Sequence, residues 1–196
     1  VKEQVSIPVH VLIRPRSGDF TYSDAEFDIM LTDIALCKEL GFEGVVSGVL
    51  NKSFTLDVER TRKLKSSAGD LTFTFHRAFD WVKDPFRTLK QLDDLQISYI
   101  LSSGQQKSAL LGIDLLSDLK LQNSRVQIMP GSGINAGNVE LFKKKGFNIV
   151  HLSGTAMTET LSKAPLISMI SSGFLSDDHK AVTKLENIKA VMNKVK

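Results

Sequence analysis

The strongest constraint on the fold of this chain is a regular alternation of short apolar runs with longer segments of helical periodicity. The runs, each five to seven residues long, occupy residues 8–14, 43–48, 71–76, 97–102, 125–129 and 148–152. Strands that alternate with helices pair in parallel and carry the helices on the outside of the sheet. The alternation therefore predicts an α/β fold with a parallel sheet.

The helical periodicity between the runs is clearest over residues 23–40. Its buried face is predicted to carry Phe27, Met30, Ile34 and Cys37. Ser23 and Glu26 have the spacing of a capping box, and Gly41 is a C-terminal stop. Further helices are expected to begin at Asp84, with Pro85 in the first turn, and to cover residues 107–121, 137–145 and 178–194.

Two architectures are compatible with this order of elements, a doubly wound sheet and a (β/α)8 barrel. No glycine-rich dinucleotide fingerprint follows the first run and no Walker sequence is present, which favours the barrel of the TIM type. Only about six of its eight strand–helix units can be counted. We expect one domain over residues 1–196, with core units in 1–153, a variable loop in 154–177 and a C-terminal helix in 178–196.

Composition limits the classes of partner. The formal net charge is +3 and the longest basic run is residues 143–145, so we expect no nucleic acid partner. No apolar run approaches the length of about 20 residues that spans a bilayer, so we expect no membrane association. A single cysteine and the absence of a secretory signal favour the cytoplasm. A sheet of six parallel strands would leave an edge strand on each side with unpaired backbone N–H and C=O groups. Such edges can pair with a second copy of the chain, so we expect a homo-oligomer.

Polar side chains stand at the ends of several predicted strands. Side chains alternate between the two faces of a strand, so the apolar rows should face the helices and the mixed rows the barrel interior. The residues expected to converge at the carboxyl ends of the strands are Arg14, Ser47, His76, Ser102 and His151. Active sites of (β/α)8 barrels lie at this rim.

One interpretation of the rim is an enzyme. His76 would act as general acid or base with Asp80 as its partner, and Arg14 with Arg16 would grip an anionic group. Glycine-containing turns after the last two strands would hold a phosphate through Gly131, Ser132, Gly133, Ser153 and Gly154. The alternative is that the polar groups only close the barrel top, that Asp80 pairs with an arginine, and that the glycines only make tight turns.

A second interpretation is a metal site. His76, His151 and Met129 lie at predicted strand ends, and two imidazoles with a thioether could hold a soft ion such as copper(I). Cys37, the one thiol, is predicted to lie on the core face of its helix, where a cysteine usually packs as a small hydrophobe.

The motifs at these strand ends resemble the CutC copper-homeostasis family over residues 1–155. They are "IRPRSGDF", "YSDAEF", "FHRAFD", "SSG", "MPGSGI" and "HLSG". The resemblance implies a (β/α)8 barrel, a cytosolic location, copper tolerance and a proposed binding of copper.

The chain also departs from the pattern of that family. The first two strand–helix units of the family have no counterpart in this sequence, and with them go the cysteines that the family would offer to copper. The segment after Gly154 matches poorly. Two functions therefore stay open: copper homeostasis, or an enzyme that acts on a small phosphorylated or anionic metabolite at the C-terminal rim.

Overall fold

Five strands form one parallel sheet in the order in which they occur along the chain. The computed structural model describes residues 1–163, 165–168 and 177–195. The strands are β1 (His10–Leu12), β2 (Gly44–Ser47), β3 (Thr72–Phe75), β4 (Tyr99–Ser102) and β5 (Gln127–Pro130). The prediction of an α/β fold with a parallel sheet is confirmed.

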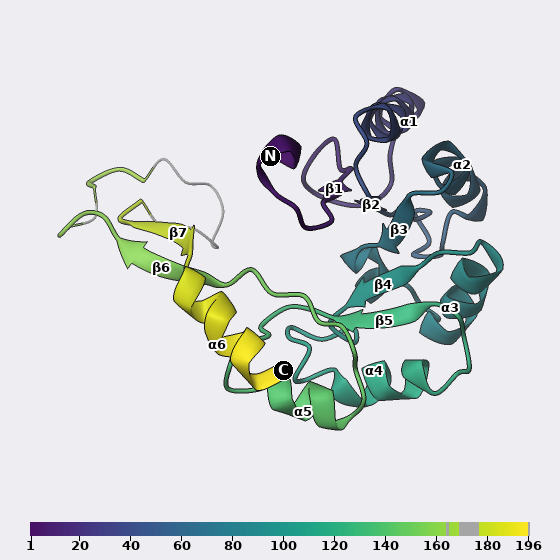
Figure 1. Ribbon diagram of the computed structural model, residues 1–196. Coiled ribbons are helices and arrows are strands. Elements are labelled where there is room, and N and C mark those ends of the chain that lie inside the picture. The colour runs from purple at the N-terminus through teal and green to yellow at the C-terminus, as the bar shows by residue number, and fades with distance from the viewer. Residues whose placement is uncertain (164, 169–176, 196) are drawn as a thin grey trace.

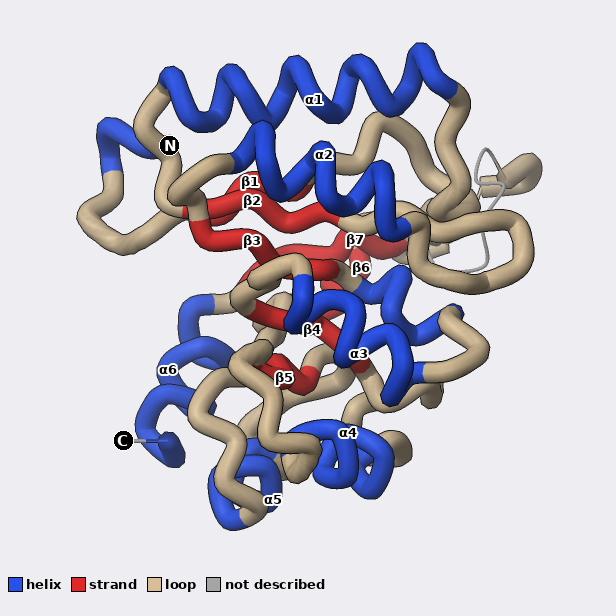
Figure 2. Tube along the Cα trace, turned by 90° about the vertical axis from the view of Figure 1, so that its right-hand side faces the viewer, coloured by secondary structure: helices blue, strands red, loops and turns tan. Residues whose placement is uncertain are grey.

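Helices join the strands and lie along the outer side of the curved sheet (Figures 1 and 2). They are α1 (Asp24–Glu39), α2 (Val58–Ala68), α3 (Pro85–Asp94), α4 (Ile113–Lys120) and α5 (Val139–Lys144), with 3-10 turns η1 (Lys2–Gln4) and η2 (Arg77–Trp81). The Ser23–Glu26 capping box of α1 is present, and Asp84 caps α3 through the Arg87 N–H. The helix predicted over 107–121 begins only at Ile113, since residues 105–112 make turns instead.

The core lies between the sheet and these helices. Phe73, Phe75 and Ile100 are fully buried and belong to one cluster with Ile34 of α1 and Leu92 of α3. The predicted orientation of the apolar rows is thus confirmed for these strands. The register also corrects two other residues. Ser47 pairs with Phe75, and Ser102 follows Ile100 in the same row, so both serines lie in the row opposite to that of His76.

The sheet forms an open arc rather than a closed barrel within the described residues (Figure 1). At β1 the inner face lies open, because His10 is exposed and Leu12 is 59% exposed. The strand predicted over 148–152 is wrong. There the chain runs beside β5 and gives only the hydrogen bond from His151 N to Pro130 O, 2.8 Å, which is too little pairing to make a strand.

The C-terminal part differs most from the prediction. β6 (Thr155–Glu159) and β7 (His179–Thr183) pair antiparallel on the side of the main sheet away from α1–α4 (Figure 1). α6 (Leu185–Val195) follows and packs on α5, with Lys194 Nζ 3.3 Å from the Glu140 carboxylate. The expected loop therefore contains a strand, and the expected last helix begins seven residues late. Residues 164 and 169–176 of that loop lie outside the described residues.

Across the described ranges, every helix is too short or too polar to traverse a lipid bilayer.

Candidate functional site

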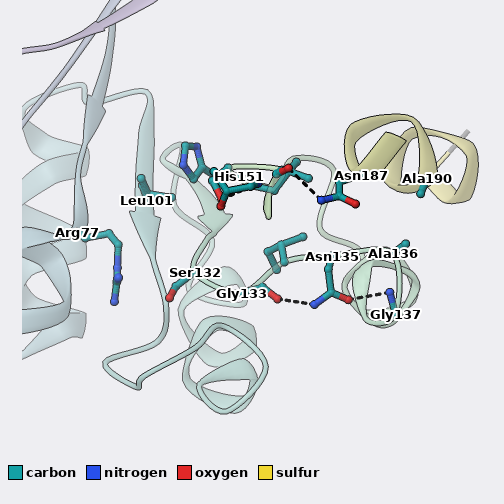
Figure 3. Close-up of a pocket in the computed structure, with 15 residues that line it drawn as sticks. Arg77, Leu101, Ser132, Gly133, Asn135, Ala136, Gly137, His151, Asn187 and Ala190 are labelled. Atoms are coloured by element: carbon teal, nitrogen blue, oxygen red, sulfur yellow. Dashed lines mark hydrogen bonds between the residues drawn. The ribbon is translucent and has the colours of Figure 1, made fainter. Parts of the chain in front are cut away.

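A pocket of about 640 Å³ opens at the carboxyl ends of β4 and β5. It lies between the turn after β5 on one side and the 151–155 segment with α6 on the other (Figure 3). Its polar lining residues are Arg77, Ser132, Asn135, His151, Ser153, Thr155 and Asn187. No aspartate or glutamate is among the described residues that line it, so its one formal charge is the Arg77 guanidinium.

The two turns that border the pocket expose backbone N–H groups. Gly133 and Gly154 have φ angles of 76° and 61°, in the left-handed region that glycine adopts without a steric cost. Ser132 has φ 81°, and hydrogen bonds from Ala109 N to its carbonyl and from its hydroxyl to Lys107 O hold it there. Within the described residues, the N–H groups of Ser132, Gly133 and Gly154 donate no hydrogen bond. All three residues line the pocket, so these N–H groups are candidate donors to an acceptor there.

A buried carboxylate sets the position of Arg77. The Asp80 side chain is 6% exposed, and it accepts hydrogen bonds from the Ser102 hydroxyl (2.6 Å), Ser103 N (3.0 Å) and Gln105 N (3.2 Å). It also accepts from Arg77 Nε at 2.8 Å. Arg77 Nη2 donates to the Ser103 hydroxyl at 2.8 Å. Two of the three guanidinium nitrogens are thereby fixed, and Nη1 has no partner among the described residues.

Asn187 of α6 ties the far wall of the pocket to the 153–154 turn. Its Nδ2 donates to Gly154 O at 3.1 Å (Figure 3), and Lys184 N donates to the same carbonyl at 2.9 Å. His151 contributes an imidazole from the segment beside β5. His151 is partly exposed, and the partial burial of its ring lowers its pKa, so the neutral form, which can donate or accept a hydrogen bond, predominates at pH 7.

His76 and Arg14 form a separate cluster at the ends of β3 and β1. The ring centroids of His76 and Phe20 are 4.9 Å apart, and Arg14 Cζ lies 4.8 Å from the centroid of the same phenyl ring. Neither His76 nor Arg14 lines the pocket. Burial, together with the nearby Arg14 charge, lowers the pKa of His76 to about 4.

Comparison with known proteins places this geometry in a family. The model of the CutC family matches residues 1–156. The chain belongs to the CutC family. Curated CutC family proteins from Salmonella schwarzengrund (strain CVM19633) and Klebsiella pneumoniae (strain 342) are 46% and 45% identical to it over 153 residues, which is 78% of this chain. This CutC chain spans 62% of the length of each of these relatives.

A solved structure agrees with the assignment to CutC. The crystal structure of a CutC protein from Streptococcus agalactiae, named for copper homeostasis, superposes with a TM-score of 0.71 at 32% sequence identity. The match covers 76% of this chain and 74% of the other. The shared architecture is the parallel sheet with outer helices, which is consistent with a TIM-barrel-like fold.

The site of this CutC chain brings together one part of the predicted set. Ser132, Gly133, Ser153 and Gly154 line the pocket, and Gly131 borders it because a Cβ there would lie 3.4 Å from His151 Cβ.

Two predicted partnerships are not observed. Asp80 pairs with Arg77 instead of His76, because the η2 turn carries it over to the loop after β4. Arg16 does not reach the pocket. Its Nε donates to Glu26 at 2.6 Å and its Nη2 to Asp19 at 3.2 Å, so it holds its own loop together.

The three predicted metal ligands are also not gathered. Extending the register of β3 and β4 by one residue places Leu101 beside His76, and Leu101 pairs with Met129. His76 and Met129 are thus two strand spacings apart, about 10 Å. His151 lies beyond Met129, next to β5. In the part of the chain that the structure describes, no three His, Cys, Asp or Glu residues cluster as metal ligands.

Sequence reasoning gave no role to three groups in the pocket. Arg77 is part of the motif "FHRAFD" but receives no role from it, although its spacing from Asp80 fits an i, i+3 ion pair. Asn135 Oδ1 accepts a hydrogen bond from Gly137 N at 2.8 Å, two residues further on, which is an asparagine turn, a structure that asparagine side chains favour. Asn187 contacts Gly154 across 33 residues, and nothing in the local sequence indicates such a contact.

Proposed function

We propose that this protein acts in copper homeostasis, and that its molecular activity is to bind a small phosphorylated or otherwise anionic metabolite in the pocket at the strand ends. Membership of the CutC family supports the first part. The second is supported by one observation: among the described residues, three backbone N–H groups without a partner and the Arg77 guanidinium border a pocket whose lining includes no carboxylate. We expect the protein to work in the cytoplasm.

The chemistry of the pocket favours an anion with several oxygen acceptors. Backbone N–H groups in left-handed turns make concave sites for phosphate and similar groups. The turns that supply them follow β5 and the 151–152 segment, the part of a (β/α)8 barrel where phosphate is often held. A cation would meet the Arg77 charge and no negative partner. His151, neutral at pH 7, adds a donor or acceptor for an uncharged part of the ligand.

A copper site inside this chain fits the residues less well. Copper(I) prefers thiolate and thioether ligands, and the one thiol, Cys37, is 6% exposed in the core with Met30. Burial raises the pKa of Cys37, which disfavours the thiolate that a metal needs. Direct binding of copper through His76, His151 and Met129 stays a prediction that the separation of these residues does not favour. We therefore propose that the protein helps the cell to tolerate copper without holding the ion at these residues.

Titration with inorganic phosphate tests the pocket. We expect a saturable change in the backbone amide NMR signals of Ser132, Gly133 and Gly154. Replacing Arg77 by glutamine should weaken phosphate binding about tenfold or more, because a hydrogen bond to a charged group is lost. Arg125→Gln is the matched control, since it removes one exposed positive charge far from the pocket. Phosphate binding that Arg77→Gln and Arg125→Gln weaken equally would contradict the proposed pocket.

A growth experiment tests the cellular role. Cells that lack the protein should stop growing at a lower copper concentration than cells that carry it, and the wild-type gene should restore growth. The Arg77→Gln variant should fail to restore it, whereas Met129→Leu, which removes the one thioether among the predicted copper ligands and does not touch the lining of the pocket, should restore it. Copper tolerance that does not depend on the protein at all would remove the first part of the proposal.

A further inference from the structure

Three residues at the ends of β1, β2 and β3 form one row, and the two outer ones carry side-chain hydrogen-bond donors that have no acceptor among the described residues. Leu12, Val46 and Thr74 pair across these strands, so two residues further on Arg14, Gly48 and His76 share one row on the inner face. Gly48 leaves the middle position free. A Cβ there would lie 2.7 Å from His76 Nδ1, which shows that the imidazole leans over Gly48 toward Arg14.

The proton of this imidazole can be assigned. His76 Nδ1 accepts a hydrogen bond from Ala78 N at 3.2 Å, so Nδ1 carries the lone pair. Burial and the Arg14 charge lower the pKa of His76 to about 4, so the ring is neutral at pH 7. The single ring proton is therefore on Nε2, which is a donor. His76 is 5% exposed, and Nε2 is buried without a partner among the described residues.

Two other polar atoms around Arg14 share this condition. Arg14 Nε is buried and unpaired, although Nη2 donates to Gly18 O at 2.7 Å. The Tyr22 hydroxyl is buried and unpaired as well. Burial raises the pKa of Tyr22, and the charge of Arg14 together with a hydrogen-bonding contact between the two side chains opposes that rise. The hydroxyl therefore lies against the guanidinium and stays protonated, and its own proton has no acceptor among the described residues. Buried donors are rarely left without an acceptor, and three around one guanidinium indicate a missing group.

Phe20 covers this cluster, and its aromatic ring is only a weak substitute for the missing hydrogen-bond acceptor. Its ring centroid lies 4.8 Å from Arg14 Cζ and 4.9 Å from the His76 ring centroid, so the aromatic ring packs against both groups. A charged oxygen acceptor would satisfy the same N–H groups far better. The way to the cluster is the open inner face of the sheet, since Arg14 is partly exposed and Leu12 next to it in the same row is exposed.

We propose that Arg14 Nε–H and His76 Nε2–H form a second binding site that takes a carboxylate group, with the Tyr22 hydroxyl as a third donor. A carboxylate fits because it is flat, accepts through two oxygens and carries the charge opposite to that of Arg14. Cations are excluded by that same charge. The site shares no residue with the pocket at Arg77, so its existence does not depend on phosphate binding there. Its carboxylate can come from a small metabolite or from an acidic side chain of a second copy of this chain.

Titration with sodium acetate at constant ionic strength tests the site. The chain has four histidines, so long-range proton–nitrogen NMR spectra can separate their ring signals. The His76 Nε2 signal should be in the neutral form and should move saturably with acetate, while that of exposed His10 should not. Arg14→Gln should weaken this response about tenfold or more. Arg125→Gln, which removes an exposed charge elsewhere, should leave it unchanged.

The source of the carboxylate follows from the dependence on protein concentration. An acetate response that is the same at all protein concentrations assigns the site to a small metabolite. A His76 Nε2 signal that moves with protein concentration before acetate is added assigns the carboxylate to a second copy of the chain. The proposal is overturned if the signal does not respond saturably to either acetate or protein concentration, or if Arg14→Gln responds like the wild type. The wild-type titration decides this even if the variant fails to fold.

Discussion

Replacing Gly104 by alanine is expected to cost about 3–5 kcal/mol of the free energy of unfolding. A Cβ at this position would lie 2.2 Å from Gly112 O and 2.8 Å from Gly112 Cα. These are backbone atoms, so no side chain can rotate out of the way, and the turn after β4 must separate from the start of α4. The φ angle of Gly104 is +68°, which adds the strain of a left-handed alanine. Urea unfolding followed by circular dichroism would measure the loss.

Gly41→Ala provides the matched control for this prediction. Gly41 has φ +71°, nearly the same as Gly104, but a Cβ there would meet no atom within 4 Å. It should therefore lose only the cost of the left-handed backbone, about 1–2 kcal/mol. The difference between the two variants isolates the close approach of the two backbone segments. Equal losses would mean that the 104–112 contact is not needed for the fold.

This contact also explains why α4 begins later than its apolar periodicity predicts. Gly112 is the N-cap of α4, and a Cβ on it would lie 2.0 Å from Ser103 O. The residues just before Gly112 therefore pack against the turn after β4, and this contact keeps them out of α4. The periodicity of apolar residues shows which face of a segment is apolar. It cannot show a backbone contact such as that between Gly104 and Gly112, eight positions apart.

The sequence predicts the strands correctly where a strand lies between two other strands of the sheet and is covered by helices. The runs at β2 to β4 are apolar because each strand lies between two others and under helices, and there the predicted strands were right. The 148–152 run has the same local pattern but gains only one hydrogen bond beside β5. In β7, Ala181 pairs with Met157 and Val182 with Ala156. The sequence pattern includes these residues in the helix predicted from residue 178, because a short apolar stretch that directly precedes a helix looks like part of its apolar face.

The site was predictable to the extent that it depends on the ends of strands. The glycine turns after β5 and around Gly154 meet because consecutive parallel segments place their carboxyl ends at one edge. The link between His76 and Asp80 failed because it depends on the path of η2, which sends Asp80 toward β4 while His76 leans over Gly48 toward β1. Two residues four positions apart therefore serve two different places on the rim.

Asp80 is the residue that fixes Arg77 at the edge of the pocket. Asp80→Asn keeps the shape of the side chain but replaces one acceptor oxygen by an NH2 donor. At Oδ1 this donor would face Ser103 N–H and Gln105 N–H, and at Oδ2 it would face Arg77 Nε–H. Leaving buried donors unpaired costs about 1–3 kcal/mol each, so we expect a loss of about 3 kcal/mol in the free energy of unfolding. Urea unfolding would measure it. Phosphate affinity should fall as well, because Arg77 loses the carboxylate that holds it at the pocket.

Asp94→Asn separates this effect from the general loss of a negative charge. Asp94 pairs with Lys90 at 3.4 Å on the surface of α3, where the two side chains are 64% and 79% exposed. An exposed i, i+4 pair contributes about 0.3–0.5 kcal/mol, so this variant should unfold almost like the wild type and bind phosphate equally well. If Asp80→Asn behaved in the same way, the buried carboxylate would not organise the loop after β4. Arg77 would then owe its place to the Ser103 hydroxyl alone.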